Sequence, residues 1–284
     1  MKYRHGFHAG NFADVHKHVT LLSVIAALQR KDKGFLYLET HSGRGLYDLG
    51  SAATHQGAEA RHGVGVLSEV PAASPQISAY LAAIEQLRAH SPEQSAHYPG
   101  SPLLAAQALR PQDRGWCFEI QAAECRALER ALQPFPRMRC ECADGYRGLA
   151  SHFPPTERRA LLFIDPPYEE QGDDLLRAIA AIDSALQRLA NAVIALWYPI
   201  KDEAGLAPWL TGLAARLSVP ALVAELWLHP RDARVGLNGS GLLLINPPWQ
   251  LDVEMQQWLP KLGAALGAAR QGGTRVQWIA HEQH

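Results

Sequence analysis

The 284-residue sequence lacks a long hydrophobic run, carries almost no net charge and contains few cysteines. No stretch approaches the roughly 18 consecutive apolar residues of a membrane-spanning helix, so we expect no membrane partner. The N-terminus is polar and rich in histidine, which argues against a signal peptide and makes the cytoplasm the expected location. The net charge of −1 argues against binding polyanions over the whole surface, but not against a local basic patch.

The cysteines form no C-x-x-C pair; they are Cys117, Cys125, Cys140 and Cys142. Cys140 and Cys142 alternate along an expected strand and would share one face of it. From this spacing we expect buried, reduced thiols, and neither a disulfide nor a metal site.

Short apolar segments alternate with helical patterns through most of the chain. We expect strands at residues 35–40, 116–120, 137–143, 160–165, 192–198, 221–228, 241–246 and 274–280. We expect helices from Asn11 to about residue 34, over about 121–133, 172–190, 203–217 and 250–266, and a short one after Asp144. Such alternation predicts a parallel sheet covered on both faces.

The helix-free link between residues 228 and 241 predicts antiparallel pairing late in the sheet. The sequence therefore predicts an α/β fold with a doubly wound, mostly parallel sheet and a late antiparallel strand, in one domain over residues 1–284. Residues from about 51 to 95 interrupt the alternation with Ala-rich helical patterning, so we expect a small helical insertion there. Residues 1–10 are expected to form an N-terminal tail.

Ligands of such sheets bind beyond the carboxyl ends of the strands. The first strand leads into a glycine turn at Gly43 and Gly45, and the next ends at Glu119, a carboxylate that can accept hydrogen bonds from a ribose. Asp48 stands where the third glycine of a dinucleotide-binding G-x-G-x-x-G would be. The turn therefore fits a nucleoside with a short zwitterionic tail, such as S-adenosylmethionine, better than the pyrophosphate of a dehydrogenase cofactor.

The fourth strand ends in Asp165, Pro166, Pro167 and Tyr168. Proline has no N–H and fixes φ, so the pair holds the backbone rigid and turns carbonyl oxygens outward. An Asp165 oxygen and the Pro166 carbonyl can together accept both hydrogens of an amino group, while the aromatic ring stacks on a base. The segment predicts methyl transfer to the exocyclic amine of an adenine.

A second segment of this kind, NPPW at residues 246–249, follows the late strand. Asparagine with two prolines and an aromatic residue offers the same acceptors in principle. We expect this strand near the edge of the sheet and far from the glycine turn, so Asn246 is interpreted as structural.

Six stretches carry a family resemblance: YRHGFHAGNFADVHKH, FLYLETHSGRGLYDLGS, YPGSP, IDPPYE, ALWYPI and GSGLLLINPPW. Taken together, they make the chain similar, over essentially its whole length, to the bacterial 23S ribosomal RNA adenine(2030)-N6-methyltransferase family. The resemblance implies a class I, Rossmann-like methyltransferase that uses S-adenosylmethionine to methylate one adenine of 23S ribosomal RNA. We expect it to act as a monomer without a metal.

The resemblance also assigns site residues by position. Asp165 would be the catalytic residue, in a motif that includes Pro166 and Tyr168. The S-adenosylmethionine site would be lined by His18, His41, Ser101, Glu119, Asp144, Gly145 and Asp165. The RNA substrate would contact Tyr3, with His5 and Lys17 in the same signature. Further candidates for phosphate contacts are Arg231 and Arg234, in the loop before the late strand.

Three other functions share the motif or the fold. A DNA adenine-N6 methyltransferase would carry a larger target-recognition region than the short insertion of this chain. A protein glutamine-N5 methyltransferase usually opens its motif with asparagine instead of aspartate. A non-enzymatic RNA-binding protein of this fold would have lost Asp165 or the glycine turn, and both are present.

Overall fold

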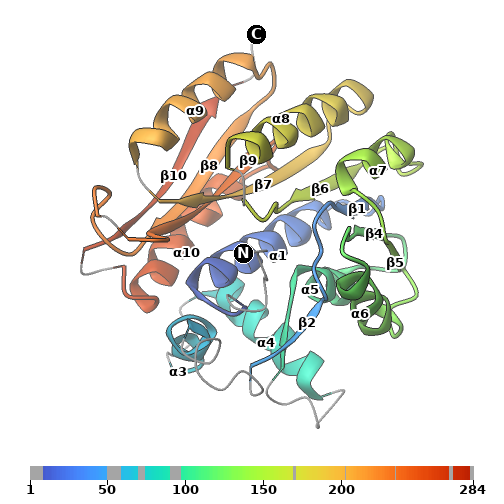
Figure 1. Cartoon of the computed structure of the whole chain (residues 1–284), viewed down its shortest axis with the longest axis horizontal. Helices are drawn as coiled ribbons and strands as arrows, with labels where there is room; N and C mark the ends of the chain where they lie inside the picture. Colours follow the sequence, from blue (N-terminus) through green and yellow to red (C-terminus); the bar gives the residue numbers. More distant parts are fainter. Residues whose placement is uncertain are drawn as a thin grey trace.

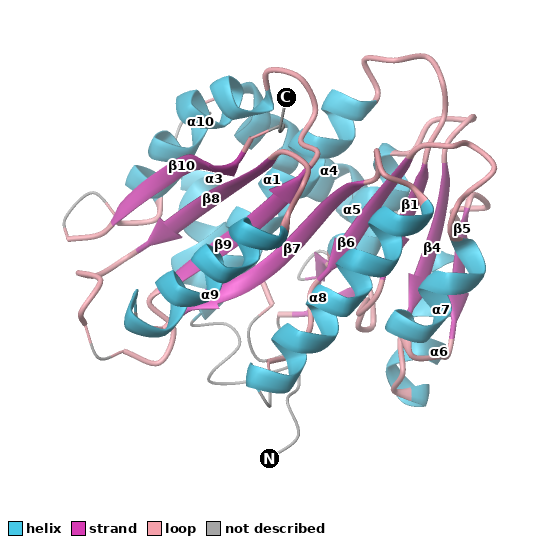
Figure 2. Ribbon diagram, turned by 90° about the horizontal axis from the view of Figure 1, so that it is seen from above, coloured by secondary structure: helices cyan, strands magenta, loops and turns pink. Residues whose placement is uncertain are grey.

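The computed structural model describes residues 9–49, 59–69, 74–89, 97–168, 171–201, 203–233, 235–268 and 271–281. Its centre is an eight-stranded sheet in the order β10-β8-β9-β7-β6-β1-β4-β5, and helices cover both faces (Figures 1 and 2). This confirms the predicted α/β, doubly wound fold. Within these ranges no helix is both long enough and apolar enough to cross a membrane.

The sheet contains β1 (Leu36–Glu39), β4 (Arg114–Phe118), β5 (Met138–Glu141), β6 (Ala160–Ile164), β7 (Val193–Ile200), β8 (Ala221–Trp227), β9 (Gly239–Ile245) and β10 (Gly273–Ala280). The helices on its faces are α1 (Phe12–Leu28), α5 (Ser101–Ala108), α6 (Ala122–Leu132), α7 (Gly145–His152), α8 (Gln171–Arg188), α9 (Glu203–Arg216) and α10 (Leu251–Ala265). Two short strands, β2 (Leu46–Asp48) and β3 (His97–Pro99), form a separate sheet.

The parallel half of the sheet has a reversal of strand order at β1. Strands β5, β4, β1, β6 and β7 are parallel neighbours. The chain passes from β1 outward to β4 and β5 and then returns to β6 on the other side of β1. The connections after β1 and β6 lead to helices on opposite faces, and this is the position where open α/β sheets bind ligands.

Two cores lie on the two faces of the sheet. Tyr37 and Phe163 pack in the core that contains α1, α5, α6 and α10. Their neighbours Leu36, Leu38 and Leu162 pack in the other core, with α7, α8 and α9. Because β6 is buried on both faces, its sequence is an unbroken apolar run. Each fully buried side chain of this size contributes about 1.5–3 kcal/mol.

The predicted antiparallel pairing late in the sheet is confirmed, because β9 runs antiparallel to both β7 and β8, and β10 antiparallel to β8. The expectation that β9 lies near the sheet edge is wrong. Helix α9 carries the chain from β7 to β8, which lies two strand positions away, and β9 then fills the position between them.

Asn246 follows β9 and lies at the opposite end of the sheet from Asp165, because β9 runs against the parallel strands. Its side-chain amide donates to the carbonyl oxygens of Ala190 and Ala192, at 2.8 and 2.9 Å. Asn246 therefore ties the exit of β9 to the entry of β7.

Helix α1 begins at Asn11, as predicted. The Asn11 side-chain oxygen accepts hydrogen bonds from the backbone N–H groups of Ala13 and Asp14, each at 3.0 Å. The helix ends at Leu28, earlier than expected. It is buried on nearly every side because it packs against α4 (Pro75–Ala89), α5, α10 and β9. Polar residues on its interior faces therefore point into the protein.

The strands β2 and β3 pair antiparallel, from Leu46 with Pro99 to Asp48 with His97. Between them, the described residues form the π-helix η2 (Arg61–Gly65), α3 (Val66–Glu69) and α4 (Pro75–Ala89). Strands of three residues have too little pattern to be recognised in the sequence. The division of the chain into one domain, an insertion at about 51–95 and a tail at 1–10 stays a prediction.

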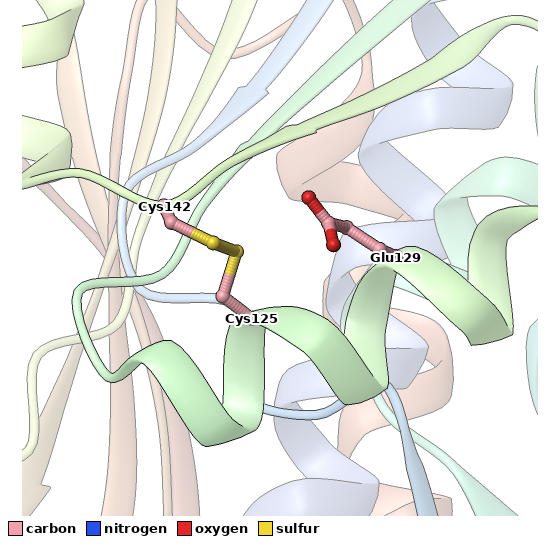
Figure 3. Close-up of side chains that lie close together, drawn as sticks. All are labelled: Cys125, Glu129 and Cys142. Carbon is pink, nitrogen blue, oxygen red and sulfur yellow. A yellow bond between two sulfur atoms is a disulfide. The ribbon is translucent and has the colours of Figure 1, made fainter.

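The expectation that all cysteines are reduced is wrong for one pair. Cys125 in α6 and Cys142, directly after β5, form a disulfide with their Cα atoms 5.6 Å apart (Figure 3). The spacing in the sequence gives no sign of the pair because the packing of α6 on β5 brings the two residues together. Cys117 and Cys140 are not disulfide-bonded.

Candidate active site

The loop after β1 contains the predicted glycine turn. Gly43 and Gly45 have φ values of +59° and +77°, in the left-handed region that glycine adopts readily. A Cβ on Gly43 would lie 2.3 Å from the hydroxyl oxygen of Tyr47, so the turn has no room for a larger residue. The Glu119 carboxylate accepts hydrogen bonds from the backbone N–H groups of Gly43 at 2.8 Å and Gln121 at 2.7 Å. Glu119 thus joins the β1 turn to the end of β4.

Asp144 and Gly145 begin helix α7 beside the same turn. One Asp144 oxygen accepts from the Tyr146 N–H at 3.0 Å, and the other accepts from Arg177 at 2.8 Å. A Cβ on Gly145 would lie 2.2 Å from the carbonyl oxygen of Thr40, so α7 starts in contact with the β1 loop. The ends of β1, β4 and β5 therefore meet at one place, as the sequence predicts.

His41 lies close enough to Asp144 and Asp165 for both charges to act on it. Burial lowers the pKa of His41 to about 4, although both carboxylates favour the charged form. Nδ1 of His41 lies 2.8 Å from the hydroxyl of Thr40, and its ring meets the Tyr146 ring edge-on with centroids 4.9 Å apart. The imidazole is therefore neutral near pH 7 and held in one orientation.

Ser101 and Glu39 form a buried polar pair below the β1 turn. The Ser101 hydroxyl donates to one Glu39 oxygen at 2.5 Å, and the Tyr37 hydroxyl donates to the other at 2.7 Å. Burial raises the pKa of Glu39 to about 8, more than these hydrogen bonds and Lys17 lower it. The glutamate at the end of β1 is therefore largely protonated at neutral pH.

His18 lies in the interior on α1. Its Nδ1 is hydrogen bonded to the Tyr98 hydroxyl at 2.7 Å, and the two rings stack with centroids 5.7 Å apart. The Tyr98 hydroxyl also lies 2.9 Å from that of Tyr80 on α4. This chain of hydrogen bonds joins α1 to β3 and to the helices between β2 and β3.

Lys17 is buried and binds two carboxylates. Its Nζ lies 2.6 Å from Asp165 and 2.9 Å from Asp14. Burial alone would lower the pKa of Lys17, but the attraction of the two carboxylates outweighs it and raises the pKa above its ordinary value. The sequence placed Lys17 among RNA-contacting residues; the structure places it inside the protein, against the motif aspartate.

Tyr168, the last residue of the motif, has φ of +52° and is almost fully buried. Its hydroxyl donates to the carbonyl oxygen of Trp197, and the two rings meet edge-on with centroids 5.6 Å apart. The Lys17 ammonium lies 5.4 Å from the centre of the Trp197 ring. The indole N–H of Trp197 donates to the Ser240 hydroxyl at 2.9 Å. This hydrogen bond fixes the orientation of the indole ring.

A cavity of about 1000 Å³ opens beside these residues. Asp165, Lys17, Tyr168 and Trp197 form one wall, and residues of η2, α3 and the late strand loops form the others. The wall of this cavity does not include Glu119 or the other residues at the ends of β4 and β5. Asp165 is thus accessible from the cavity and also near the place where β1, β4 and β5 end.

Four other residues were predicted to contact the RNA. Tyr3 and His5 lie outside the described residues, and so does Arg234. Arg231 was expected to bind phosphate, but its guanidinium donates to the buried Glu225 at 3.1 Å and lies over the Trp227 ring. Glu225 is a buried acid on the preceding strand β8, which the sequence pattern does not reveal, and it explains this difference.

Sequence reasoning gave no role to Trp197 or Ile120. Trp197 lies on β7, whose carboxyl end was visible in the sequence, but nothing in the pattern shows that its ring faces Lys17. Ile120 directly follows Glu119 and is 64% exposed, although it is a large apolar residue next to a strand end. An apolar residue after the acid that ends a strand was the available signal.

Comparison with known proteins decides the family. A family model described as ribosomal RNA large subunit methyltransferase D, RlmJ, matches residues 32–280. The chain belongs to this family. Two members named ribosomal RNA large subunit methyltransferase J, from Haemophilus influenzae and Escherichia coli, are each 36% identical to it over 282 residues, which are 99% of this chain and 100% of each relative.

A solved structure has the same fold as this RlmJ-family chain. The crystal structure of protein LPL1258 from Legionella pneumophila str. Philadelphia 1 matches with a TM-score of 0.83 at 31% identity, and covers 97% of this chain and 99% of that one. The RlmJ-family chain is therefore a methyltransferase with a Rossmann-like fold, and it needs a methyl donor.

Proposed function

We propose that this RlmJ-family protein transfers a methyl group from S-adenosylmethionine to N6 of one adenine in 23S ribosomal RNA, the adenine that the resemblance numbers 2030. The position of Asp165 carries the proposal. Asp165 ends β6 next to the converging ends of β1, β4 and β5, and it also lines the large cavity. A methyl donor bound at the strand ends and an adenine bound in the cavity would meet at this residue.

The residues at the ends of β4 and β5 fit the nucleoside of the cofactor, which supplies an electrophilic methyl group when bound. Each Glu119 oxygen accepts one backbone hydrogen bond and keeps a lone pair for a ribose hydroxyl. Ile120 presents exposed apolar surface beside Glu119 that an adenine ring would cover. We assign Asp144, Gly145, His41, Ser101 and His18 to the same site, as the resemblance implies.

Asp165 and Pro166 would hold the target amine. An adenine flipped into the cavity would donate one N6 hydrogen to Asp165 and the other to the Pro166 carbonyl oxygen. This would pull the amine out of conjugation with its ring, so that its lone pair could form the new N–C bond while the S–C bond of the donor breaks and sulfur keeps the electron pair. The proton displaced from N6 would leave to water. Positioning of this kind supplies several kcal/mol when reacting atoms lie about 3–3.5 Å apart.

Lys17 sets the role of Asp165. It holds one oxygen of Asp165 at 2.6 Å, so the other oxygen is offered to the amine. Because one oxygen is held in the ion pair with Lys17 and the other is left for the amine, we assign Asp165 hydrogen-bond acceptance and not general-base catalysis. Asp14 supplies the second negative charge that keeps Lys17 protonated.

Tyr168 and Trp197 would form the apolar wall for the base. Both line the cavity, and the hydrogen bond from Tyr168 to the Trp197 backbone fixes their relative orientation. Stacking of a base on such a ring is worth about 1–3 kcal/mol. We further propose that Tyr3 and His5 contact the RNA, that the protein acts as a monomer in the cytoplasm, and that methyl transfer needs no metal.

The test compares ribosomal RNA from cells with and without the gene by mass spectrometry of N6-methyladenosine. We expect one such nucleotide per 23S molecule to disappear, and to return with the wild-type gene but not with Asp165→Ala. An unchanged count would refute the proposal. Transfer by the purified protein to duplex DNA but not to RNA would favour the DNA enzyme, and RNA binding without transfer the non-enzymatic alternative.

A further inference from the structure

Helix α6 and the end of β5 bring three sulfur atoms and a carboxylate into a small volume at the β5 edge of the sheet, on the face that also carries α1 and α10. Cys125 and Glu129 lie one turn apart on α6, and Cys140 and Cys142 come from β5 and the residue after it. The ligand atoms of Cys125, Glu129 and Cys142 all lie within 4.8 Å of one another (Figure 3). The Sγ atoms of Cys125 and Cys140 are 3.6 Å apart.

We propose that this cluster binds a thiophilic divalent cation of the zinc type once the Cys125–Cys142 disulfide is reduced. A thiol reductant would supply two electrons and two protons to the two sulfurs and would itself become a disulfide. The cation would then displace the thiol protons and bind thiolate sulfur. The disulfide and the metal complex are thus alternative states of the same atoms.

The distances fit such a cation. Sulfurs at about 2.3 Å from a tetrahedral zinc ion lie roughly 3.8 Å from each other, close to the separation of Cys125 and Cys140. The Glu129 carboxylate offers an oxygen, which zinc also accepts. The backbone also holds Cys142 close to Cys125, since their Cα atoms are only 5.6 Å apart.

A disulfide alone leaves two members of the cluster without a role. It uses the sulfurs of Cys125 and Cys142, whereas Cys140 keeps a thiol in contact with Cys125. Glu129 points its carboxylate toward the sulfurs, and the structure gives it no ion pair with any described residue, although Arg126 and Arg130 lie on the same helix. A third thiol and an unneutralised carboxylate are what a cation needs.

The cluster is open to solvent on one side. Cys142 and Glu129 are exposed, so a cation can reach the site from solvent.

The site would also bear on the proposed cofactor residues, because Cys142 precedes Asp144 by two residues. Either the disulfide or the cation ties the beginning of the loop that leads to Asp144 to helix α6. The reduced protein would thus retain this connection when the cation is bound. Metal binding itself does not depend on the proposed function, and it is measured without cofactor or RNA.

The experiment titrates the full-length protein with Co²⁺ without oxygen, after reduction by a phosphine that does not bind metals. We expect one equivalent of Co²⁺ to bind with a thiolate-to-metal absorption band, and Zn²⁺ to displace it. Cys142→Ser should remove most of the band. Glu129→Gln should weaken binding by more than about tenfold, the scale that changes even outside the ligand shell can reach.

Two variants serve as matched controls. Glu124→Gln changes a carboxylate of the same helix that instead pairs with Arg44, and Cys117→Ala removes a thiol outside the cluster. Both should bind Co²⁺ like the wild type, and the oxidised protein should not bind it. Circular dichroism verifies the fold, and the exposed Glu129 tolerates its substitution. No band in the folded, reduced protein, or a band that survives both Cys142→Ser and Glu129→Gln, would overturn the proposal and leave an ordinary disulfide.

Discussion

The substitution Glu39→Gln tests whether a protonated carboxyl group lies at the end of β1. Glu39 is completely buried and accepts hydrogen bonds from Ser101 and Tyr37. Glutamine has the same shape and keeps an acceptor oxygen, but it cannot ionise. The variant therefore removes one titration from the core while it leaves the packing of β1 almost unchanged.

The pKa of Glu39 determines how stability should change with pH. The folded protein keeps the proton up to about pH 8, whereas the unfolded chain loses it near the ordinary value of 4.5. Because the folded pKa is the higher one, the contribution of Glu39 to stability is fully present below pH 4.5 and is lost as the pH rises through 8. The loss is about 1.4 kcal/mol per pH unit, or about 5 kcal/mol over the whole window.

The assay is urea unfolding of the wild type and of Glu39→Gln, followed by circular dichroism across this pH range. Other groups titrate in both proteins, so the difference between the two free energies of unfolding isolates Glu39. We expect the two proteins to be similar at the acid end and the variant to be the more stable by several kcal/mol at the alkaline end. Parallel curves would show that Glu39 ionises normally in the fold and would refute the reasoning.

Four further predictions concern the site. Asp165→Ala should lower methyl incorporation into ribosomal RNA by at least about 10²-fold, the scale for loss of one positioned hydrogen-bonding group, whereas Asn246→Ala should retain most activity; the reverse result would exchange the roles of the two motifs. Lys17→Met leaves the buried Asp14 and the partly buried Asp165 without their cation, so it should cost about 3–5 kcal/mol in urea unfolding and reduce turnover, and a variant of wild-type stability would contradict the pairing. Ile120→Ser should leave the melting temperature of the ligand-free protein nearly unchanged. It should lower the affinity for S-adenosylmethionine, measured by calorimetry, about tenfold, as loss of about 1.5 kcal/mol of apolar contact predicts; an unchanged affinity would place the adenine elsewhere. Tyr3→Ala should sharply reduce RNA methylation while S-adenosylmethionine affinity stays the same, and normal turnover would exclude a role of Tyr3 in binding RNA.

Those parts of the fold that depend on local pattern were predictable from the sequence. The apolar run that ends at Asp165 predicts β6, and Asn11 predicts the start of α1. The turn at Gly43 and the acid at Glu119 were expected to meet because parallel strands end at one edge of the sheet. The structure brings them within hydrogen-bonding distance.

Other features arise from pairings between distant segments, which a single sequence does not encode visibly. The position of β9 between β7 and β8 depends on the path of α9, and the Cys125–Cys142 pair on helix packing. Lys17 looked like one of several surface cations near the N-terminus. Only the structure shows that it is buried and paired with Asp165.

The burial of α1 restricts the order in which the protein can be assembled during synthesis. This helix leaves the translating machinery first among the described elements, yet His16 on it is hydrogen bonded to Ser240 of β9, 224 residues later. Contacts of such long range form slowly, and apolar surface that waits for them invites aggregation. The nascent chain must therefore keep α1 covered by temporary contacts or by a chaperone until β9 has been made. A chain released before Ser240 would lack one wall of α1, the helix that brings Lys17 to Asp165.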